Sequence, residues 1–371
     1  MRVQLKDVAS FSKGKQINGN DLVVDGKYAF LNGGINPSGK WHEYNVEGNS
    51  IAISEGGNSC GYVNYMEEAY WCGAHCYYLY DLKYDAKYIY YALKSQQDSI
   101  MQLRSGACMP NIKKNALGEF AFSIEEDKTK QALVVDSLDK VSELISLRKE
   151  QLAKLDELVK ARFVELFGDA EHNEKGLPTS PMTELCEIID GDRGKNYPKQ
   201  EEFSEEGFCL FLNAKNVTSN GFSFENCMYI TEEKDKILRN GKLSRGDVVL
   251  TTRGTLGNLA FYDESVPYEH MRINSGMVIL RMKRDRITER FFIEQFKMQL
   301  ASIKERIASG SAQPQLPIST MNKIVMLVPD VELQNQFAAF VEQTDKSKMV
   351  IQQSLNKLET LKKSLMQKYF G

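Results

Sequence analysis

The stretch KLDELVKARFVELFG at residues 154–168 returns near the end of the chain as KLETLKKSLMQKYFG at residues 357–371. The two stretches begin 203 residues apart, and both close with Phe-Gly. Apolar residues recur in them every three or four positions, which is typical of an amphipathic helix. A repeat at this distance indicates that the chain is built from two similar halves.

Further landmarks keep the same order in both halves, although their spacing grows along the chain. The matched pairs are Gly14-Lys15 with Gly194-Lys195, Gly48 and Gly56 with Gly246 and Gly254, and Ser105-Gly106, Pro110 and Ile112 with Ser309-Gly310, Pro314 and Leu316. The offsets are 180, 198 and 204 residues. We therefore expect insertions in the globular part of the second half and a nearly constant length for its helical end.

A seven-residue apolar repeat precedes each Phe-Gly ending and predicts a helix that pairs with another helix. The predicted packing residues are Leu138, Ile145, Leu152, Leu155, Val159 and Leu166 in the first stretch, and Phe337, Ile351, Leu355, Leu358 and Leu365 in the second. Neither stretch contains proline or internal glycine, so helices of about 38 residues, roughly 57 Å long, are expected. Pairing within the chain is favoured by high effective concentration, and two independent oligomerisation coiled coils remain the alternative.

Each globular part contains a glycine turn between two short apolar stretches, which predicts a β-hairpin. The first runs from Ser50–Ile53 through the turn 54–59 to Tyr62-Val63, and the second from Val248–Thr251 through 252–257 to Leu259–Phe261. Helices are expected at 86–103 and 288–307, with the glycine of each Ser-Gly pair as a left-handed cap. The predicted fold class is α+β, with mixed strands and helices in each half.

Composition sets the broad class of the protein. A chain of 371 residues with 42% hydrophobic residues is expected to form two globular domains rather than one. Seven cysteines without a regular framework, no signal-peptide core and no bilayer-length apolar run predict a cytoplasmic protein that contacts no membrane. The net charge of -3 is unusual for a nucleic-acid reader, but residues 239–306 carry more basic than acidic side chains.

The layout of globular part, helix, globular part, helix resembles the specificity (S) subunit of type I restriction-modification enzymes. The resemblance covers nearly the whole chain, and its most specific segments are 155–168, 345–348, 354–359 and 365–371. It implies two target recognition domains, at 1–125 and 169–330, and two conserved helical regions, at 126–168 and 331–371. It further implies that the two helices form an antiparallel coiled-coil spacer with internal pseudo-twofold symmetry.

The same resemblance implies the function and the partners. Each recognition domain would read one half of a bipartite site on double-stranded DNA, and the chain would position two DNA adenine methyltransferase (M) subunits and, in the full complex, restriction (R) subunits. The chain itself would be non-catalytic and would need no cofactor. The alternative is a scaffold protein that binds no DNA and oligomerises through its helices, which the near-neutral charge favours.

The candidate DNA contacts lie in loops that follow short strands. Base reading requires paired donors or acceptors, which arginine, asparagine, glutamine and glutamate supply. Lysine or arginine beside glycine suits a phosphate contact, because glycine lets the backbone come close. The phosphate candidates are Lys13, Lys15, Arg193 and Lys195, and the base-reading candidates are Glu55, Asn58, Asn111, Arg253, Ser311, Gln313 and Gln315. Glu55 and Arg253 are expected at equivalent positions of the two glycine turns, and solvated surface residues are the alternative for all of them.

The sequence lacks the motifs of a zinc site and of several enzyme classes. Cys72, His75 and Cys76 are too few for a structural zinc site, so no metal is expected and the segment is interpreted as a buried strand. The only Asn-Pro, Asn36-Pro37, is followed by Ser38 rather than by the proline and aromatic residue of an adenine methyltransferase. A phosphate loop ending in Gly-Lys-Ser/Thr is absent as well.

Overall fold

The computed structural model describes residues 1–106, 110–308 and 315–371. The chain forms two compact units: unit 1 comprises Met1–Gln151 together with Ile351–Gly371, and unit 2 comprises Leu152–Val350. The last residues of the chain therefore complete the unit that the first residues begin.

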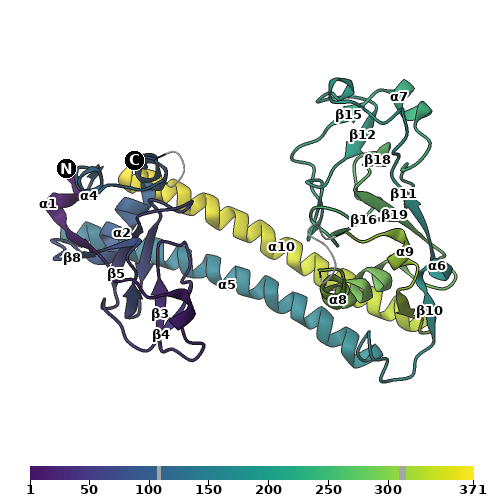
Figure 1. The fold of residues 1–371 in the computed structure, drawn as a ribbon, viewed down its shortest axis with the longest axis horizontal. Coiled ribbons are helices and arrows are strands. Elements are labelled where there is room, and N and C mark those ends of the chain that lie inside the picture. Colours follow the sequence, from purple (N-terminus) through teal and green to yellow (C-terminus); the bar gives the residue numbers. More distant parts are fainter. Residues whose placement is uncertain (107–109, 309–314) are drawn as a thin grey trace. The chain divides into compact units, whose positions relative to one another are not determined.

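Unit 1 contains a four-stranded sheet in the order β2-β8-β5-β6, a three-stranded sheet in the order β4-β3-β7, and the pair β1-β9 (Figure 1). Its strands are β1 (Arg2–Gln4), β2 (Ser10–Lys13), β3 (Tyr28–Leu31), β4 (Gly39–Trp41), β5 (Ser50–Ser54), β6 (Val63–Met66), β7 (Tyr70–Cys72), β8 (Cys76–Tyr80) and β9 (Ala121–Ser123). Its short helices are α1 (Leu5–Val8), α2 (Ala86–Ser95), α3 (Gln97–Gln102) and α4 (Lys114–Gly118), with a 3-10 turn at Gly19–Asp21.

Unit 2 repeats this plan with sheets in the orders β11-β19-β16-β17 and β15-β12-β18 and the pair β10-β20. Its strands are β10 (Thr179–Pro181), β11 (Cys186–Asp190), β12 (Cys209–Leu212), β13 (Val217–Thr218), β14 (Gly221–Phe222), β15 (Tyr229–Ile230), β16 (Asp247–Thr251), β17 (Leu259–Phe261), β18 (Met271–Ile273), β19 (Met277–Met282) and β20 (Val325–Leu327). Its helices are α6 (Met182–Leu185), α7 (Glu232–Ile237), α8 (Glu289–Ala308) and α9 (Ile318–Met321), with a 3-10 turn at Gln200–Glu202.

The pairing pattern shows that the two globular folds are equivalent. β3 pairs with β7 in parallel, and β12 pairs with β18 in parallel, while the other ladders between named strands are antiparallel. Unit 2 adds β13, β14 and α7 between β12 and β16. These added elements account for most of the growing offset between the halves, and the mixed α/β class agrees with the expectation from sequence.

Two 40-residue helices, α5 (Lys128–Phe167) and α10 (Val331–Phe370), follow the globular folds. In unit 1 the start of α5 packs with the end of α10, and Lys149 of α5 pairs with Glu359 of α10 at 3.4 Å. In unit 2 the end of α5 packs with the start of α10, and Asp156 pairs with Lys348 at 2.5 Å. The two helices are therefore antiparallel neighbours within each unit.

The predicted packing residues of these helices are buried or half-buried. Leu138, Val159, Phe337 and Leu355 are buried. The other predicted packing residues are half-buried, namely Ile145, Leu152, Leu155, Leu166, Ile351, Leu358 and Leu365. A helix pair in water leaves its seam partly exposed unless a globular part covers it, which explains the gradation.

Each long helix ends in a globular core. Phe167 of α5 is buried in unit 2, where its ring lies 4.8 Å from that of Phe291. Phe370 of α10 is buried in unit 1, where its ring lies 5.4 Å from that of Tyr88. Burial of these aromatic ends contributes several kcal/mol to each unit. The repeated Phe-Gly endings are thus core anchors.

Three local expectations need correction. The predicted single helix at 86–103 is divided at Gln96 into α2 and α3, because Gln97 accepts a hydrogen bond from Val63 N and donates one to Gly61 O instead of extending the helix surface. Gly106 has φ +103° but does not cap a helix, since α3 ends at Gln102; Gly310 lies outside the described residues. The segment interpreted as one strand contains the end of β7 and the start of β8, joined by a turn at 73–75.

None of the helices in the described part of the chain combines the length and the hydropathy of a bilayer span.

Candidate nucleic-acid interface

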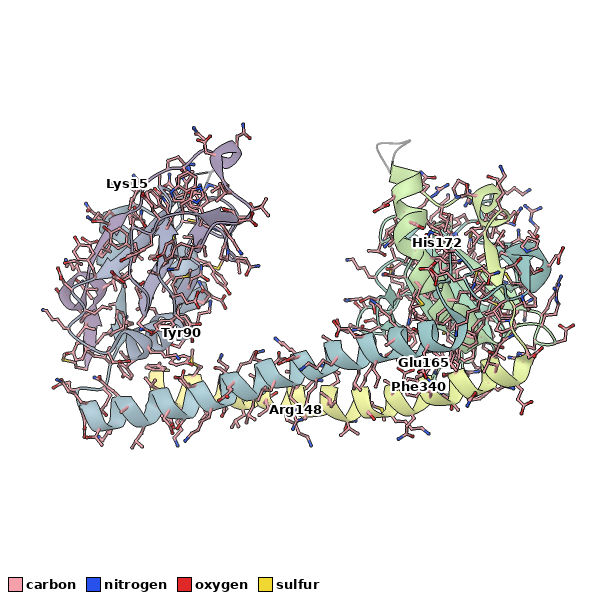
Figure 2. All side chains as sticks on the ribbon, turned by 90° about the horizontal axis from the view of Figure 1, so that it is seen from below. Lys15, Tyr90, Arg148, Glu165, His172 and Phe340 are labelled. Atoms are coloured by element: carbon pink, nitrogen blue, oxygen red, sulfur yellow. The ribbon has the colours of Figure 1, made fainter. Side chains whose placement is uncertain are left out.

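The candidate residues of unit 1 gather at one edge of the four-stranded sheet. Backbone hydrogen bonds hold the loops there: Lys15 N donates to Cys72 O (2.9 Å), Glu55 N to His75 O (2.8 Å), and Ile112 N to Glu55 O (2.9 Å). Figure 2 shows Lys15 on the side of unit 1 away from α5 and α10, whereas Tyr90 lies close to them. We call this side, formed by the loops at 13–16, 55–60, 73–75 and 110–112, the loop edge of unit 1.

Two predicted DNA contacts of this edge contact each other. Lys13 Nζ lies 2.6 Å from Glu55 Oε1, and His75 Nδ1 lies 3.8 Å from Glu55 Oε2. The Glu55 side chain is only 14% exposed, whereas that of Lys13 is 48% exposed. Exposed ion pairs contribute about 0–1 kcal/mol, so an incoming phosphate or base can displace this pairing at small cost.

The remaining unit 1 candidates are exposed. Asn58 lies in the glycine turn, and Asn111 bridges to both Gly56 and Ser105 through its backbone. Lys15 is exposed as well, one residue beyond Gly14. The structure thus brings Lys13, Lys15, Glu55, Asn58 and Asn111 to one edge.

Unit 2 has a corresponding loop edge, formed by 190–195, 252–258, 274–276 and 315–316. Arg193 Nη2 donates to Ser275 O (3.1 Å) and to Asp190 Oδ1 (3.0 Å), and Arg253 N donates to Gly276 O (3.2 Å). The side chain of Arg253 is exposed and makes no ion pair with the residues that the structure describes. Lys195 and Gln315 are exposed there too, while Ser311 and Gln313 lie outside the described residues.

Hydrogen bonding corrects the expected match between Glu55 and Arg253. Glu55 donates its N–H to the residue before β8 and accepts one from Ile112, and in unit 2 Thr252 does the same with Gly276 O (2.8 Å) and Leu316 N (3.1 Å). Thr252 is therefore the counterpart of Glu55, and Arg253 stands one residue further into the turn, opposite Gly56. The comparison by glycine spacing was wrong by one position because unit 1 has two adjacent glycines, and Gly57, not Gly56, shares the positive φ of Gly254 (+76° and +73°).

The match of Gly14 with Gly194 was also wrong. A Cβ on Gly14 would lie 1.9 Å from Cys72 O, and one on Gly191 would lie 2.2 Å from Asn274 O, so both glycines touch the backbone at the end of the second strand of the parallel pair. Gly191 is thus the counterpart of Gly14. Lys13 then corresponds to Asp190, and the basic character of the two edges comes from different positions.

Three residues in or beside the two edges were not singled out in the sequence. His75 was considered only with the cysteines, although it contacts Glu55. Lys215 and Lys304 face a groove beside the turn 252–258 in unit 2. Lys215 lies in a polar loop and Lys304 on the exposed face of α8, and a single exposed lysine carries no sequence signal at either place, so only the folded arrangement identifies these two.

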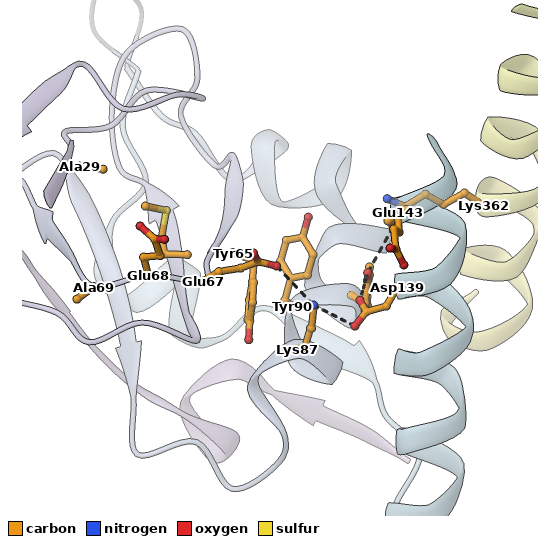
Figure 3. A pocket seen from close by; sticks show the side chains of 13 residues that line it. Ala29, Tyr65, Glu67, Glu68, Ala69, Lys87, Tyr90, Asp139, Glu143 and Lys362 are labelled. Carbon is orange, nitrogen blue, oxygen red and sulfur yellow. Dashed lines mark hydrogen bonds and ion pairs between the residues drawn. The ribbon is translucent and has the colours of Figure 1, made fainter. Parts of the chain in front are cut away.

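A second surface of unit 1 has different chemistry. A cavity of about 760 Å³ lies between β3, β6, the loop 67–69, α2 and the paired helices α5 and α10 (Figure 3). It is lined by four carboxylates, Glu67, Glu68, Asp139 and Glu143, and two lysines, Lys87 and Lys362; Lys87 Nζ lies 3.0 Å from Asp139. Carboxylates repel phosphate, so this cavity is unsuited to DNA.

Within the described residues no group of His, Cys, Asp and Glu side chains could hold a metal ion. The Cys76 thiol is buried, and the hydrogen bond with Cys72 together with burial raises its pKa well above the usual value. A thiol with a raised pKa is a poor nucleophile. Both cysteines are core residues of unit 1.

Known proteins with the same architecture are type I specificity subunits. The family model for the type I restriction modification DNA specificity domain matches residues 1–157 and 175–360. A Mycoplasma genitalium protein named as a type I specificity subunit is 29% identical over 96% of this chain and 90% of its own length. A Mycoplasma pneumoniae protein of the same name is 27% identical over 99% of this chain and 94% of its own length.

Solved structures agree in fold. The crystal structure of a type I restriction-modification S subunit from M. genitalium matches with a TM-score of 0.64 at 24% identity, covering 100% of this chain and 96% of that one. A chain from a study of type I complex assembly and conformational transition matches with a TM-score of 0.54 at 13% identity, covering 100% and 97%. This chain therefore belongs to the type I restriction-modification DNA specificity family.

Proposed function

We propose that this chain is the non-catalytic DNA-reading subunit of a type I complex, and that its two loop edges read the two halves of a split site on double-stranded DNA. The observation that carries the proposal is the repeated loop edge: one topology is presented twice, with Lys13, Glu55 and Asn58 on one copy and Arg193 and Arg253 on the other. Such side chains supply the paired donors and acceptors that distinguish bases in the major groove.

The proposed domains are recognition domains at 1–125 and 169–330 and spacer helices at 126–168 and 331–371. A 40-residue helix is about 60 Å long, which equals roughly 18 base pairs of B-DNA. That length accommodates two short half-sites and an unread gap. We propose that α5 and α10 determine the gap, with internal pseudo-twofold symmetry relating the two recognition domains.

The proposed protein partners are two methyltransferase subunits, joined by restriction subunits in the full complex. Exposed leucines on α5 support a protein contact: Leu133, Leu144, Leu147 and Leu158 are each at least 44% exposed. Their spacings of 11 and 3 residues bring them onto one stripe of the helix. A leucine stripe in water is unfavourable and suits a partner surface.

The test is co-expression with the methyltransferase subunit of the same system, followed by genome-wide mapping of N6-methyladenine. The expected result is a motif with two short defined halves and an undefined gap. A contiguous motif, or no motif in a complex that assembles, would contradict the proposal.

The second candidate is a scaffold that binds no DNA, which the net charge of -3 favours. Binding of the assembled complex to duplex DNA at increasing salt separates the two functions. A DNA reader loses affinity steeply as salt rises, because phosphate contacts release counterions. A scaffold shows no binding at any salt concentration.

A further inference from the structure

The largest difference between the two loop edges is an insertion in unit 2. Residues 32–38 join β3 to β4 in unit 1, whereas residues 213–228 join β12 to β15 in unit 2 and form the hairpin β13–β14. The two loops begin at equivalent places, since Gly73 N donates to Leu31 O (2.8 Å) and Asn274 N donates to Leu212 O (3.1 Å).

In unit 1 the short loop closes over the glycine turn. Ser54 Oγ donates to Gly34 O (3.1 Å), and Ser59 Oγ donates to Gly33 O (2.7 Å). In unit 2 the hairpin is held further along the turn, where Asn258 Nδ2 donates to Val217 O (2.9 Å). A groove of about 730 Å³ lies between the hairpin, the turn and α8.

The groove has the chemistry of a nucleic-acid backbone site. Its charged lining residues are two lysines, Lys215 and Lys304, and no carboxylate lines it. Both lysines are exposed, and neither is paired with an acid among the residues that the structure describes. Leu256 contributes a small apolar surface beside the hydroxyl of Thr218. Unpaired cations over apolar and hydroxyl groups suit a phosphate and its sugar.

The position of the groove points to the same occupant. Gly254, Thr255 and Leu256 line it and belong to the turn that carries Arg253. Gly254 has φ +73° and no side chain, so a DNA strand can approach the backbone there closely. The cavity of unit 1 differs in both respects, since carboxylates line it and it lies against the helices.

We propose that this groove binds the sugar–phosphate backbone of the duplex next to the bases read by unit 2, with Lys215 and Lys304 each contacting a phosphate. The inference rests on the proposed DNA-reading function and adds an asymmetry to it. Unit 2 holds the duplex over a longer stretch than unit 1 and supplies more of the affinity. Phosphate contacts carry no sequence information, so these lysines anchor the site without defining its bases.

The experiment measures binding of the assembled complex with its methyltransferase subunit to a duplex carrying the mapped site, at several salt concentrations. Lys215→Ala and Lys304→Ala are each expected to weaken binding roughly tenfold at ~0.1 M salt and to reduce the salt slope by about 1. The methylated motif stays unchanged. Lys323→Ala is the matched control, because Lys323 is an exposed lysine of unit 2 that does not line the groove.

The outcomes separate this inference from the proposed function. A wild-type complex that methylates a split motif, combined with wild-type affinity and salt slope in Lys215→Ala and Lys304→Ala, overturns the groove while the function stands. Loss of the complex on size exclusion, with no loss of DNA affinity per assembled complex, overturns it in favour of a protein partner. Absence of any duplex binding by the wild-type complex overturns both. Lys215→Glu, which keeps a long side chain, is expected to weaken binding more than Lys215→Ala if phosphate is the occupant.

Discussion

The loop edges of the two units differ more in how their charges are paired than in how their strands are arranged. In unit 1, Glu55 lies between Lys13 and His75, so its carboxylate is already engaged. In unit 2, Arg193 is paired with Asp190, whereas Arg253 forms no ion pair with the described residues. The sheets therefore supply a common frame, and the loops decide which charges are available to a ligand.

The cores of the two units differ in how many aromatic rings surround the phenylalanine at the end of each long helix. Phe167 in unit 2 lies 4.9 Å from Phe163, 4.8 Å from Phe291 and 5.6 Å from Phe337, measured between ring centroids. Among the described residues of unit 1, Phe370, its counterpart, has one close aromatic partner, Tyr88 at 5.4 Å. The same Phe-Gly ending is thus more deeply integrated in unit 2.

The largest expected effect comes from truncating these anchors. Phe167→Ala should lower the free energy of unfolding of unit 2 near the upper end of about 3–5 kcal/mol, because it loses aromatic contacts as well as apolar burial. Phe370→Ala should lower the free energy of unfolding of unit 1 by an amount nearer the lower end of the same range. Hydrogen exchange measured by mass spectrometry assigns each loss to its unit.

Tryptophan fluorescence supplies the control, since Trp41 and Trp71 both lie in unit 1. In urea titrations the fluorescence midpoint should move for Phe370→Ala and much less for Phe167→Ala. Equal shifts of the fluorescence midpoint in both variants would show that the two units unfold together. The two anchors could then not be compared unit by unit.

The next effect concerns an ion pair of unit 2 that has no buried counterpart among the described residues of unit 1. Arg272 Nε lies 2.5 Å from Asp235 Oδ1, and both side chains are at most 5% exposed. The corresponding position in β7 is Trp71, which donates Nε1–H to Lys15 O (2.7 Å). Asp235→Ala leaves the arginine buried without its partner and should cost unit 2 about 3–5 kcal/mol.

Acid should reproduce part of this loss. Burial alone would raise the pKa of Asp235, but hydrogen bonds from Lys242 and Arg272 outweigh it and hold the pKa below the usual value. A carboxyl with a lowered pKa stabilises the fold fully above its unfolded pKa of about 3.9, and this contribution is lost progressively as the pH falls from that value through the lower folded pKa. The urea midpoint of unit 2 should differ between wild type and Asp235→Ala at pH 7, and this difference should be smaller at pH 3. A constant difference between them would assign the loss to packing instead.

The helices and hairpins could be predicted from sequence because their signals are local. Seven-residue spacing from Leu138 to Leu166 follows from helix geometry alone, and glycine between short apolar runs indicates a turn wherever it occurs. The break at Gln96 could not be predicted in this way. It depends on hydrogen bonds between Gln97 and residues more than 30 positions away, and no glycine or proline marks it.

The sequence indicated which loops carry the candidate residues, but it matched the residues of the two units incorrectly. Lys13 and Glu55 were chosen from separate loops as independent contacts, and only the folded sheet shows that they form an ion pair. Spacing between glycines suggested Arg253 as the counterpart of Glu55, but hydrogen bonds assign Thr252. Loop lengths change freely over a common frame, so sequence offsets lose register where recognition residues lie.

The smallest effect tests the charge difference with which the two edges were compared. Arg253→Ala should relax one position of the half-site read by unit 2, with a loss of about 1–3 kcal/mol in discrimination, because a free guanidinium can bind a guanine in a bidentate way. Glu55→Gln should change the half-site read by unit 1 less. In the wild type, Glu55 must open its ion pair with Lys13 before it contacts a base, and this cost of about 0–1 kcal/mol offsets part of the gain from the contact. Genome-wide methylation maps of both variants, read at near-matching sites, measure the two effects together. Each substitution should leave the half-site of the opposite unit unchanged, so relaxation of both half-sites by either variant would mean that the two edges do not read separate sequences.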